Sequence, residues 1–274
     1  MAVTAGFAGL GGDVHYVEPG VEFKSFRRGL RPRHVIGVHF SGHVLLATDG
    51  LSLPPFVRYQ MGGEAELRGF DNGSTGPIVS VPGTAQVDVF NNDGSPRTVT
   101  VLDPNGNHVR QQVTMPVALD RALAPGGDTK LVANIEYRIP LIRWIELVAF
   151  DDIGSNRIRF ADQLRLTRSY LDVLNFSFPD FGATQPHTIA NTARPRMSTG
   201  LELRVRVPRM QLPLRVYWAY NPWIVREGNV NFFAPDRAAF PNKLTFDNAA
   251  STLGAPIRYA EPRNSIRVSI GRTF

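Results

Sequence analysis

The 274-residue sequence contains no cysteine and no long apolar run. Without cysteine the chain can form no disulfide, zinc–thiolate site or iron–sulfur centre, and it has no cysteine nucleophile. No stretch of 18 apolar residues occurs, which excludes a membrane-spanning helix. Strands of a closed barrel remain possible, since each crosses a bilayer with only ~9–11 residues of alternating character. The N-terminus lacks a basic segment followed by an apolar stretch, so we expect no signal peptide.

The chain is basic, with a formal net charge of +6 and an isoelectric point near 10.0. Blocks of lysine and arginine are nevertheless missing, and most of the cations are arginines dispersed among apolar residues. Because nucleic-acid partners are usually bound by clustered cations, we expect no nucleic-acid binding. A hydrophobic content of 43% excludes a disordered chain, and the 25 glycines and 21 prolines, many of them clustered, argue against a helix bundle.

Alternation of apolar and polar residues with period two is the dominant pattern. It is clearest in runs that begin at Leu131, Leu201, Leu214 and Ser265. Residues 14–27, 34–48 and 144–154 follow it less cleanly, and the short run 2–8 is an eighth candidate. We therefore predict an all-β protein of about eight strands.

The connections between these runs alternate in length. Short turns at 28–33, 140–143 and 208–213 alternate with long stretches at 49–128, 155–196 and 222–263. Transmembrane barrels have this asymmetry, with tight turns at one end and long loops at the other, whereas a soluble sandwich has no reason for it. The pattern favours a transmembrane antiparallel β-barrel, with a water-soluble barrel or jelly roll as the alternative.

In each predicted strand the charged residues occupy alternate positions, and this predicts which face of the strand points inward. A charge that faces mid-bilayer lipid costs ~2–4 kcal/mol, so Glu202, Arg204 and Arg206 are expected to line a polar lumen. Aromatic residues are expected near strand ends, where interfacial side chains belong. These are Tyr137, Trp144, Trp218, Tyr220 and Trp223.

Five segments, in order, resemble those of the bacterial surface antigen family, the barrel domain of the Omp-eighty-five superfamily whose best-known members are BamA-type insertases. The first, Arg58–Phe70, reads RYQMGGEAELRGF and is similar to the family's GGxxxLRGF/Y loop. The others are ANIEYRIP at 133–140, FDDIG at 150–154, STGLEL at 198–203 (followed by PLR at 213–215 and YNP at 220–222), and the terminal GRTF at 271–274. One such match is weak, but five in order over residues 58–274 are specific.

This resemblance implies roles for particular residues. The family's loop arginine, here Arg68, folds back into the barrel and meets strand acids, for which Glu136 and Asp152 share the predicted inward parity. Its planar, permanently charged fork suits carboxylates in a partly dry lumen. The functional loop motif would then comprise Gly62, Gly63, Leu67, Arg68, Gly69 and Phe70. The C-terminal strand signal would comprise Val268, Ile270, Gly271 and Phe274.

The chain also departs from the family. A full-length family barrel has sixteen strands and is preceded by periplasmic POTRA domains, whereas this chain resembles only the second half of the barrel and shows no POTRA-like region. Within the long loop 49–128, the segment 81–128 looks like an insertion. We expect residues 1–274 to form a single barrel domain, either half of a sixteen-strand barrel or a short barrel.

Other candidate sites are weak. His39 and His43 are too far apart along a strand to chelate one metal, so we expect two lumen-facing histidines. A calcium loop that began at Asp103 would need glycine and glutamate where His108 and Thr114 stand, so a turn is expected at Asp103–Asn107. No serine lies in a hydrolase elbow, and no phosphate loop or catalytic constellation appears. We expect no enzyme activity, no metal and no cofactor.

The resemblance implies a bacterial outer-membrane protein that inserts outer-membrane proteins or translocates polypeptides through a lateral seam, without covalent catalysis. The expected partners are outer-membrane lipid, unfolded outer-membrane protein or translocated polypeptide, and a second copy of the chain in a homodimer that completes sixteen strands. Two alternatives stay open: a passive pore for small polar solutes, and a soluble β-protein that binds an anionic ligand through its arginines.

Overall fold

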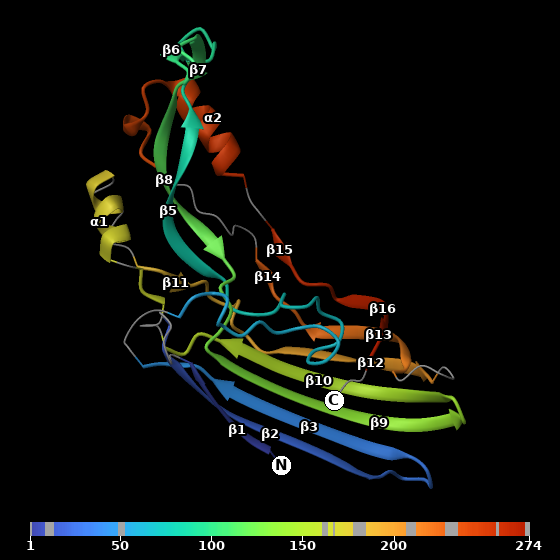
Figure 1. The fold of residues 1–274 in the computed structure, drawn as a ribbon. Coiled ribbons are helices and arrows are strands. Elements are labelled where there is room, and N and C mark those ends of the chain that lie inside the picture. Colours follow the sequence, from blue (N-terminus) through green and yellow to red (C-terminus); the bar gives the residue numbers. More distant parts are fainter. Residues whose placement is uncertain are drawn as a thin grey trace.

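A computed structural model describes residues 2–8, 14–48, 53–160, 164–166, 168–177, 185–206, 212–227, 235–255 and 258–271. Its main feature is one antiparallel sheet in which eight strands follow one another in chain order, with β4 paired to β2 as a short ninth (Figure 1). The eight strands are β1 Ala2–Ala8, β2 Tyr16–Arg28, β3 Val35–Val44, β9 Thr129–Ile142, β10 Ile145–Arg157, β12 Arg196–Val205, β13 Leu214–Trp223 and β16 Asn264–Ile270; β4 is Leu46–Ala47. The predicted all-β fold class and strand count are confirmed.

The two faces of this sheet have the polarity of a membrane barrel. Outward residues in register, such as Ile135 on β9, Leu201 on β12 and Trp218 on β13, are about half exposed, while inward residues such as Glu136 and Glu202 are fully buried. A large exposed apolar face is costly in water and favourable in lipid. The inward parity predicted for Glu202 and Arg204 is therefore correct.

Two details differ from expectation. Arg206 lies just beyond the end of β12 and is exposed, so it does not line the lumen. Trp218 is the fifth residue of β13, not a strand-end residue, although Trp144 and Trp223 do lie at strand ends. Outward aromatic side chains pack on neighbouring strands anywhere along a barrel, so parity alone does not give their depth.

The sheet is not closed. Among the described residues, β1 pairs only with β2 and β16 pairs only with β13, so each leaves one edge without a neighbouring strand. No helix in the described part of the chain is long and apolar enough to cross a membrane.

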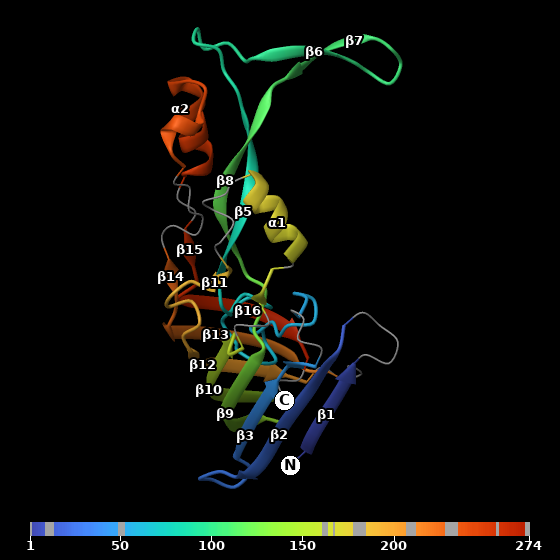
Figure 2. The same cartoon turned by 90° about the vertical axis from the view of Figure 1, so that its left-hand side faces the viewer.

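The long connections form a separate structure at one end of the sheet. Residues 79–123 make a long hairpin of β5 (Val79–Asp88) and β8 (Thr114–Leu123), which projects away from the sheet and carries a second hairpin at its tip (Figure 2). The remaining elements are β6 Thr98–Leu102, β7 His108–Gln112, α1 Arg168–Ser177, β11 His187–Thr188, β14 Arg226–Glu227, a 3₁₀ helix Arg237–Ala239, α2 Lys243–Leu253 and β15 Tyr259–Ala260. Asp103 accepts hydrogen bonds from the backbone N–H groups of Asn105 and Asn107, which makes the turn expected there.

Helix α2 packs against the outer part of the projecting hairpin, away from its base at Val79 and Leu123 (Figure 1). Val87 and Val117 from the hairpin meet Phe240 and Ala249, and Phe246 completes this small core. The helix begins where Asn242 accepts a hydrogen bond from the Thr245 N–H at 2.8 Å, and the same amide donates to the Phe90 carbonyl oxygen at 2.6 Å. One side chain thus caps the helix and ties it to the hairpin.

Removing this cap should loosen α2 without affecting the barrel. Asn242→Ala is expected to destabilise the helix by about 1 kcal/mol, since an N-cap hydrogen bond is lost. Hydrogen exchange should show faster exchange in residues 243–253, while Ser251→Ala, an exposed change on the same helix, should leave exchange unchanged. Equal protection in the Asn242 variant and the wild type would contradict the prediction.

Candidate functional site

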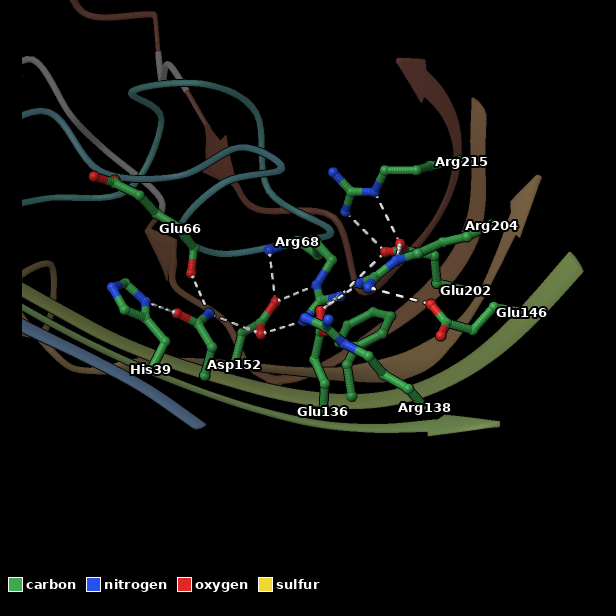
Figure 3. A network of polar contacts seen from close by, with 12 residues as sticks. His39, Glu66, Arg68, Glu136, Arg138, Glu146, Asp152, Glu202, Arg204 and Arg215 are labelled. Carbon is green, nitrogen blue, oxygen red and sulfur yellow. Dashed lines mark hydrogen bonds and ion pairs between the residues drawn. The ribbon is translucent and has the colours of Figure 1, made fainter. Parts of the chain in front are cut away.

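The loop between β4 and β5 lies over the inward face of the curved sheet and carries Arg68 (Figure 3). Its chain reverses tightly: the Leu67 N–H donates to the Gly63 carbonyl oxygen at 2.8 Å, and the Gly63 N–H donates to the Phe70 carbonyl oxygen at 3.2 Å. Leu67 and Phe70 are fully buried and pack with Met61 and Val132 in an apolar cluster. The apolar residues of the motif therefore fix the loop on the sheet, and the arginine between them points to the strands.

Arg68 is completely buried and uses its whole fork. Nε and Nη2 donate to the two carboxylate oxygens of Asp152, both at 2.7 Å, and its backbone N–H also donates to Asp152 at 3.1 Å. Nη1 donates to Glu136 at 2.8 Å and to Glu202 at 3.1 Å. The guanidinium carbon lies 3.7 Å from the centre of the Phe150 ring. One side chain thereby joins β9, β10 and β12.

Both acids expected beside Arg68 are in contact with it, and Glu202 is a third that was expected only to line the lumen. Its signal was present in the sequence, since it shares the inward parity of its strand. No sequence spacing, however, shows that β12 comes within reach of the loop. That proximity depends on how strongly the sheet curves.

A second group of arginines balances the acids. Arg215 makes two parallel hydrogen bonds to Glu202, both at 2.8 Å, and Arg138 binds the second oxygen of Glu136 at 2.7 Å. Arg204 bridges Glu136 and Glu202 and also lies 3.8 Å from Glu146. Buried carboxylates need such partners because each uncompensated charge would be costly in a dry interior. Sequence reasoning did not single out Arg138 or Arg215.

The network extends toward β3 through Asn134. Its amide nitrogen donates to Asp152 and to the Glu66 carbonyl oxygen, both at 2.8 Å, and its oxygen is 2.8 Å from Nδ1 of His39. His39 also contacts Glu22 on β2 at 3.2 Å. His39 and His43, which were expected to face the lumen, both do so; His43 lies 3.8 Å from Glu18. No group of three or more His, Asp or Glu side chains in the described ranges could hold a metal ion.

Glycine is required at position 69. Its φ is +89°, in the left-handed region, and a Cβ there would lie 2.5 Å from the Asn221 side-chain oxygen and 2.8 Å from the Ala219 Cβ. Asn221 donates to the Gly69 carbonyl oxygen at 3.1 Å. The backbone of the loop at Gly69 therefore lies directly against the side chains of Ala219 and Asn221 on β13, and only glycine allows so close an approach. Gly62 and Gly63 also have positive φ.

A separate buried pair fixes the loop at the end where the long connections meet. Arg196 at the start of β12 binds Glu261 at 2.9 Å, and Glu261 accepts the Val225 N–H at 2.7 Å. Tyr259 donates to the Ser74 carbonyl oxygen at 2.6 Å. Burial, reinforced by the Glu261 carboxylate, raises the pKa of the Tyr259 hydroxyl to about 12, so it remains a donor at neutral pH.

Tyr59 ties the loop to the opposite side of the sheet. Its hydroxyl donates to the Glu18 carboxylate on β2 at 2.8 Å. Burial and this carboxylate raise the pKa of the Tyr59 hydroxyl well above its usual range. The loop is thus attached to β2, to the central strands and to β13 by different side chains.

The C-terminal signal residues lie elsewhere. Val268 and Ile270 on β16 point outward and are more than half exposed, and Gly271 follows the strand. Val268 and Ile270 therefore belong to the outer face of an edge strand, and none of the described hydrogen bonds of Arg68 involves these residues. Phe274, the last residue of the expected signal, lies outside the described residues.

Comparison with known proteins identifies the family of the chain. The family model of the Omp85 superfamily domain matches residues 1–234. The chain belongs to the Omp85 superfamily. Omp85 proteins are β-barrels of the bacterial outer membrane, and this is where the chain resides.

Solved structures and curated sequences add little to this assignment. Among solved structures, BamA from Haemophilus ducreyi lacking POTRA domains 1–3 is similar, with 21% identity and a TM-score of 0.45 over 80% of this chain. The match covers 34% of that chain, so this Omp85 sequence spans about a third of its length. No curated protein sequence gives a match.

Truncating Arg68 should release the loop while the barrel stays folded. Removing one partner of a buried ion pair typically costs ~3–5 kcal/mol, because the remaining charges are left uncompensated. Arg68→Ala should therefore speed hydrogen exchange and proteolysis within residues 59–75, with heat-modifiable electrophoretic mobility retained. Arg267→Ala removes a partly exposed pair with Asp71 on the same loop and is the matched control, for which we expect little change. A loop equally protected in the Arg68 variant would count against its role as an anchor.

Proposed function

We propose that this Omp85 chain supplies one half of a sixteen-strand barrel that inserts outer-membrane proteins or translocates polypeptides, acting through a lateral seam and without covalent catalysis. The observation that carries the proposal is the position of the Arg68 anchor. It fixes the loop to β9, β10 and β12, in the middle of the sheet. Both unpaired edges, on β1 and β16, lie outside the anchored region.

This arrangement separates a rigid part of the barrel from a part that can open. Opening the sheet at an edge breaks no contact of the Arg68 network, whereas opening it between β9 and β12 would break the ion pairs. An edge that faces lipid presents backbone N–H and C=O groups, and each one without a hydrogen-bond partner costs several kcal/mol. An incoming strand can form these hydrogen bonds by β-augmentation. The expected substrates are therefore unfolded outer-membrane proteins or translocated polypeptides with strand-forming segments.

The β16 edge is the one we assign to the seam. It is short, it pairs with β13 over Asn264–Ile270, and its outward residues Val268 and Ile270 are exposed. The signal residues Val268, Ile270, Gly271 and Phe274 would then serve the edge itself rather than the lumen.

A passive pore for small polar solutes is the second candidate, and the polar inward face of the sheet favours it. Against it, the loop covers that face with completely buried side chains, including Leu67, Arg68 and Phe70. A conducting path would have to pass beside the loop or require its release.

The insertase proposal predicts faster folding of a barrel substrate in vesicles that contain this protein. The folding rate of a small urea-denatured outer-membrane protein, followed by heat-modifiable mobility, should rise with wild type. It should fall toward that of empty vesicles with Arg68→Ala, because the loop no longer braces the sheet. Arg97→Ala, an exposed change on the projecting hairpin, is the control. Bilayer conductance without any acceleration of folding would favour the pore and contradict the proposal.

We also propose that a second copy of the chain completes the barrel. Two eight-strand sheets related by a twofold axis would pair β1 of each with β16 of the other and leave no open edge in lipid. An eight-strand barrel closed on itself has an interior filled by side chains alone, which leaves no room for the Arg68 loop.

Cysteines introduced at Val3 on β1 and Val268 on β16 test this closure, since the chain has no other cysteine. Oxidation in detergent should give a dimer-sized product, and reduction should restore the monomer. A double variant that links only within the monomer, or does not link at all, would contradict the shared barrel.

A further inference from the structure

The end of the sheet with the short turns is lined by exposed arginines. We define the arginine rim as the six exposed arginines on or beside the turns β2–β3, β9–β10 and β12–β13: Arg27, Arg28, Arg31, Arg33, Arg143 and Arg206. The only acid in the described parts of these turns (residues 27–34, 141–146, 206 and 212–213) is Glu146, which lies 3.8 Å from Arg204. The rim therefore carries charge of one sign.

The opposite end of the molecule is different. The hairpins that project there expose side chains of both signs, the acids Asp88 and Asp93 and the cations Arg97 and Arg110. In Figure 1 the β2–β3 and β9–β10 turns lie at the far end of the strands from these hairpins. The excess of cations is thus a property of one rim and not of the whole surface.

Exposed apolar side chains alternate with the arginines. Leu30, at the tip of the β2–β3 turn, is 90% exposed, and Leu141, Ile142 and Trp144 on the next turn are each about half exposed. The Arg143 guanidinium lies 4.9 Å from the centre of the Trp144 ring. An anionic lipid offers partners for both kinds of side chain at a fixed spacing, because its phosphate lies directly beside its acyl chains.

The rim also continues the lipid-facing surface of the barrel. Arg27 has the outward parity of Val21 and Phe23 on β2, and in register it lies beside Ile36 of β3. Its guanidinium therefore stands at the boundary of the outward apolar face, where headgroups meet the barrel.

The β2–β3 turn is held in a defined shape. The Gly29 N–H donates to the His34 carbonyl oxygen at 2.8 Å, and the Tyr137 hydroxyl contacts both the Leu30 N–H at 3.3 Å and Nδ1 of His34 at 2.8 Å. Arg33 has a φ of +74°, a region in which glycine or asparagine is cheaper than arginine. The turn thus holds a cation at a position where its backbone favours another residue.

We propose that the arginine rim binds the phosphate groups of anionic glycerophospholipids in the membrane leaflet at the short-turn end. Guanidinium forks match phosphate oxygens in a bidentate geometry, and Leu30, Leu141 and Ile142 contact the adjoining acyl chains. This lipid contact goes beyond the seam and its substrates, and it requires only that the chain be inserted in a membrane.

Lipid selectivity at the protein surface tests the proposal. The full chain is reconstituted, and spin-labelled phosphatidylglycerol and phosphatidylcholine are compared by the fraction of each that is motionally restricted. Wild type should restrict phosphatidylglycerol about fivefold more than phosphatidylcholine at low salt, as expected for one arginine beside each bound headgroup, and the preference should shrink in molar salt. Changing Arg27, Arg31 and Arg33 to Gln removes half of the arginine rim and should roughly halve the excess of restricted phosphatidylglycerol.

Matched controls keep the test decisive. Changing the exposed Arg97, Arg110 and Arg237 to Gln removes the same charge from the opposite end and should leave the ratio unchanged. If the triple rim variant does not fold, the double variant Arg31→Gln/Arg33→Gln, confined to the turn, should still lower the ratio. Equal binding of the two lipids by wild type, or a preference that the rim changes leave undiminished, overturns the proposal, and the former would point to an acidic protein partner.

Discussion

The buried charge of Arg68 is the constraint on which this structure depends. A guanidinium without water must be surrounded by acids, and those acids must come from strands that a barrel wall brings together. Asp152, Glu136 and Glu202 meet that need from β10, β9 and β12, and Arg138, Arg204 and Arg215 then balance the acids in turn. The inward face of this sheet is therefore built largely on ion pairs beside one small apolar cluster, while most of the apolar strand residues face outward.

This inversion explains which parts of the fold could be predicted. Alternation identifies strands whether the apolar face meets a core or lipid, so runs such as Leu131–Ile139 and Leu201–Val205 indicated β9 and β12. Alternation could not fix where β12 begins, because Arg196 and Ser198 are buried polar residues that continue the strand before its apolar outward face starts. It also could not indicate the depth of Trp218.

The site was predictable to the same extent. The motif and the inward parity of Glu136 and Asp152 brought those acids to Arg68, because neighbouring strands in chain order are neighbours in the sheet. Glu202 required knowledge of the sheet's curvature, and Asn134 required the position of the loop backbone at Glu66. Contacts that depend on tertiary geometry produce no regular alternation in the sequence. The sequence shows only that a polar residue lies on the inward-facing parity of its strand.

The projecting hairpin in the long connection leaves the Arg68 network undisturbed. The hairpin enters at Val79 and leaves at Leu123, which are paired with each other, so its ends are adjacent and displace nothing in the loop before it. Beyond it, the chain is fixed again where Gly127 bridges Tyr59 and where Asp128 accepts the backbone N–H groups of Arg159 and Phe160. The Leu45 N–H donates to the Asp128 carbonyl oxygen at 2.7 Å, which returns β9 to the edge of β3. Because these contacts close around the base of the hairpin, the hairpin can vary in length or sequence while Arg68 keeps its three acids. An addition within β9 or β10 themselves has no such closure and would shift Glu136 or Asp152 out of register.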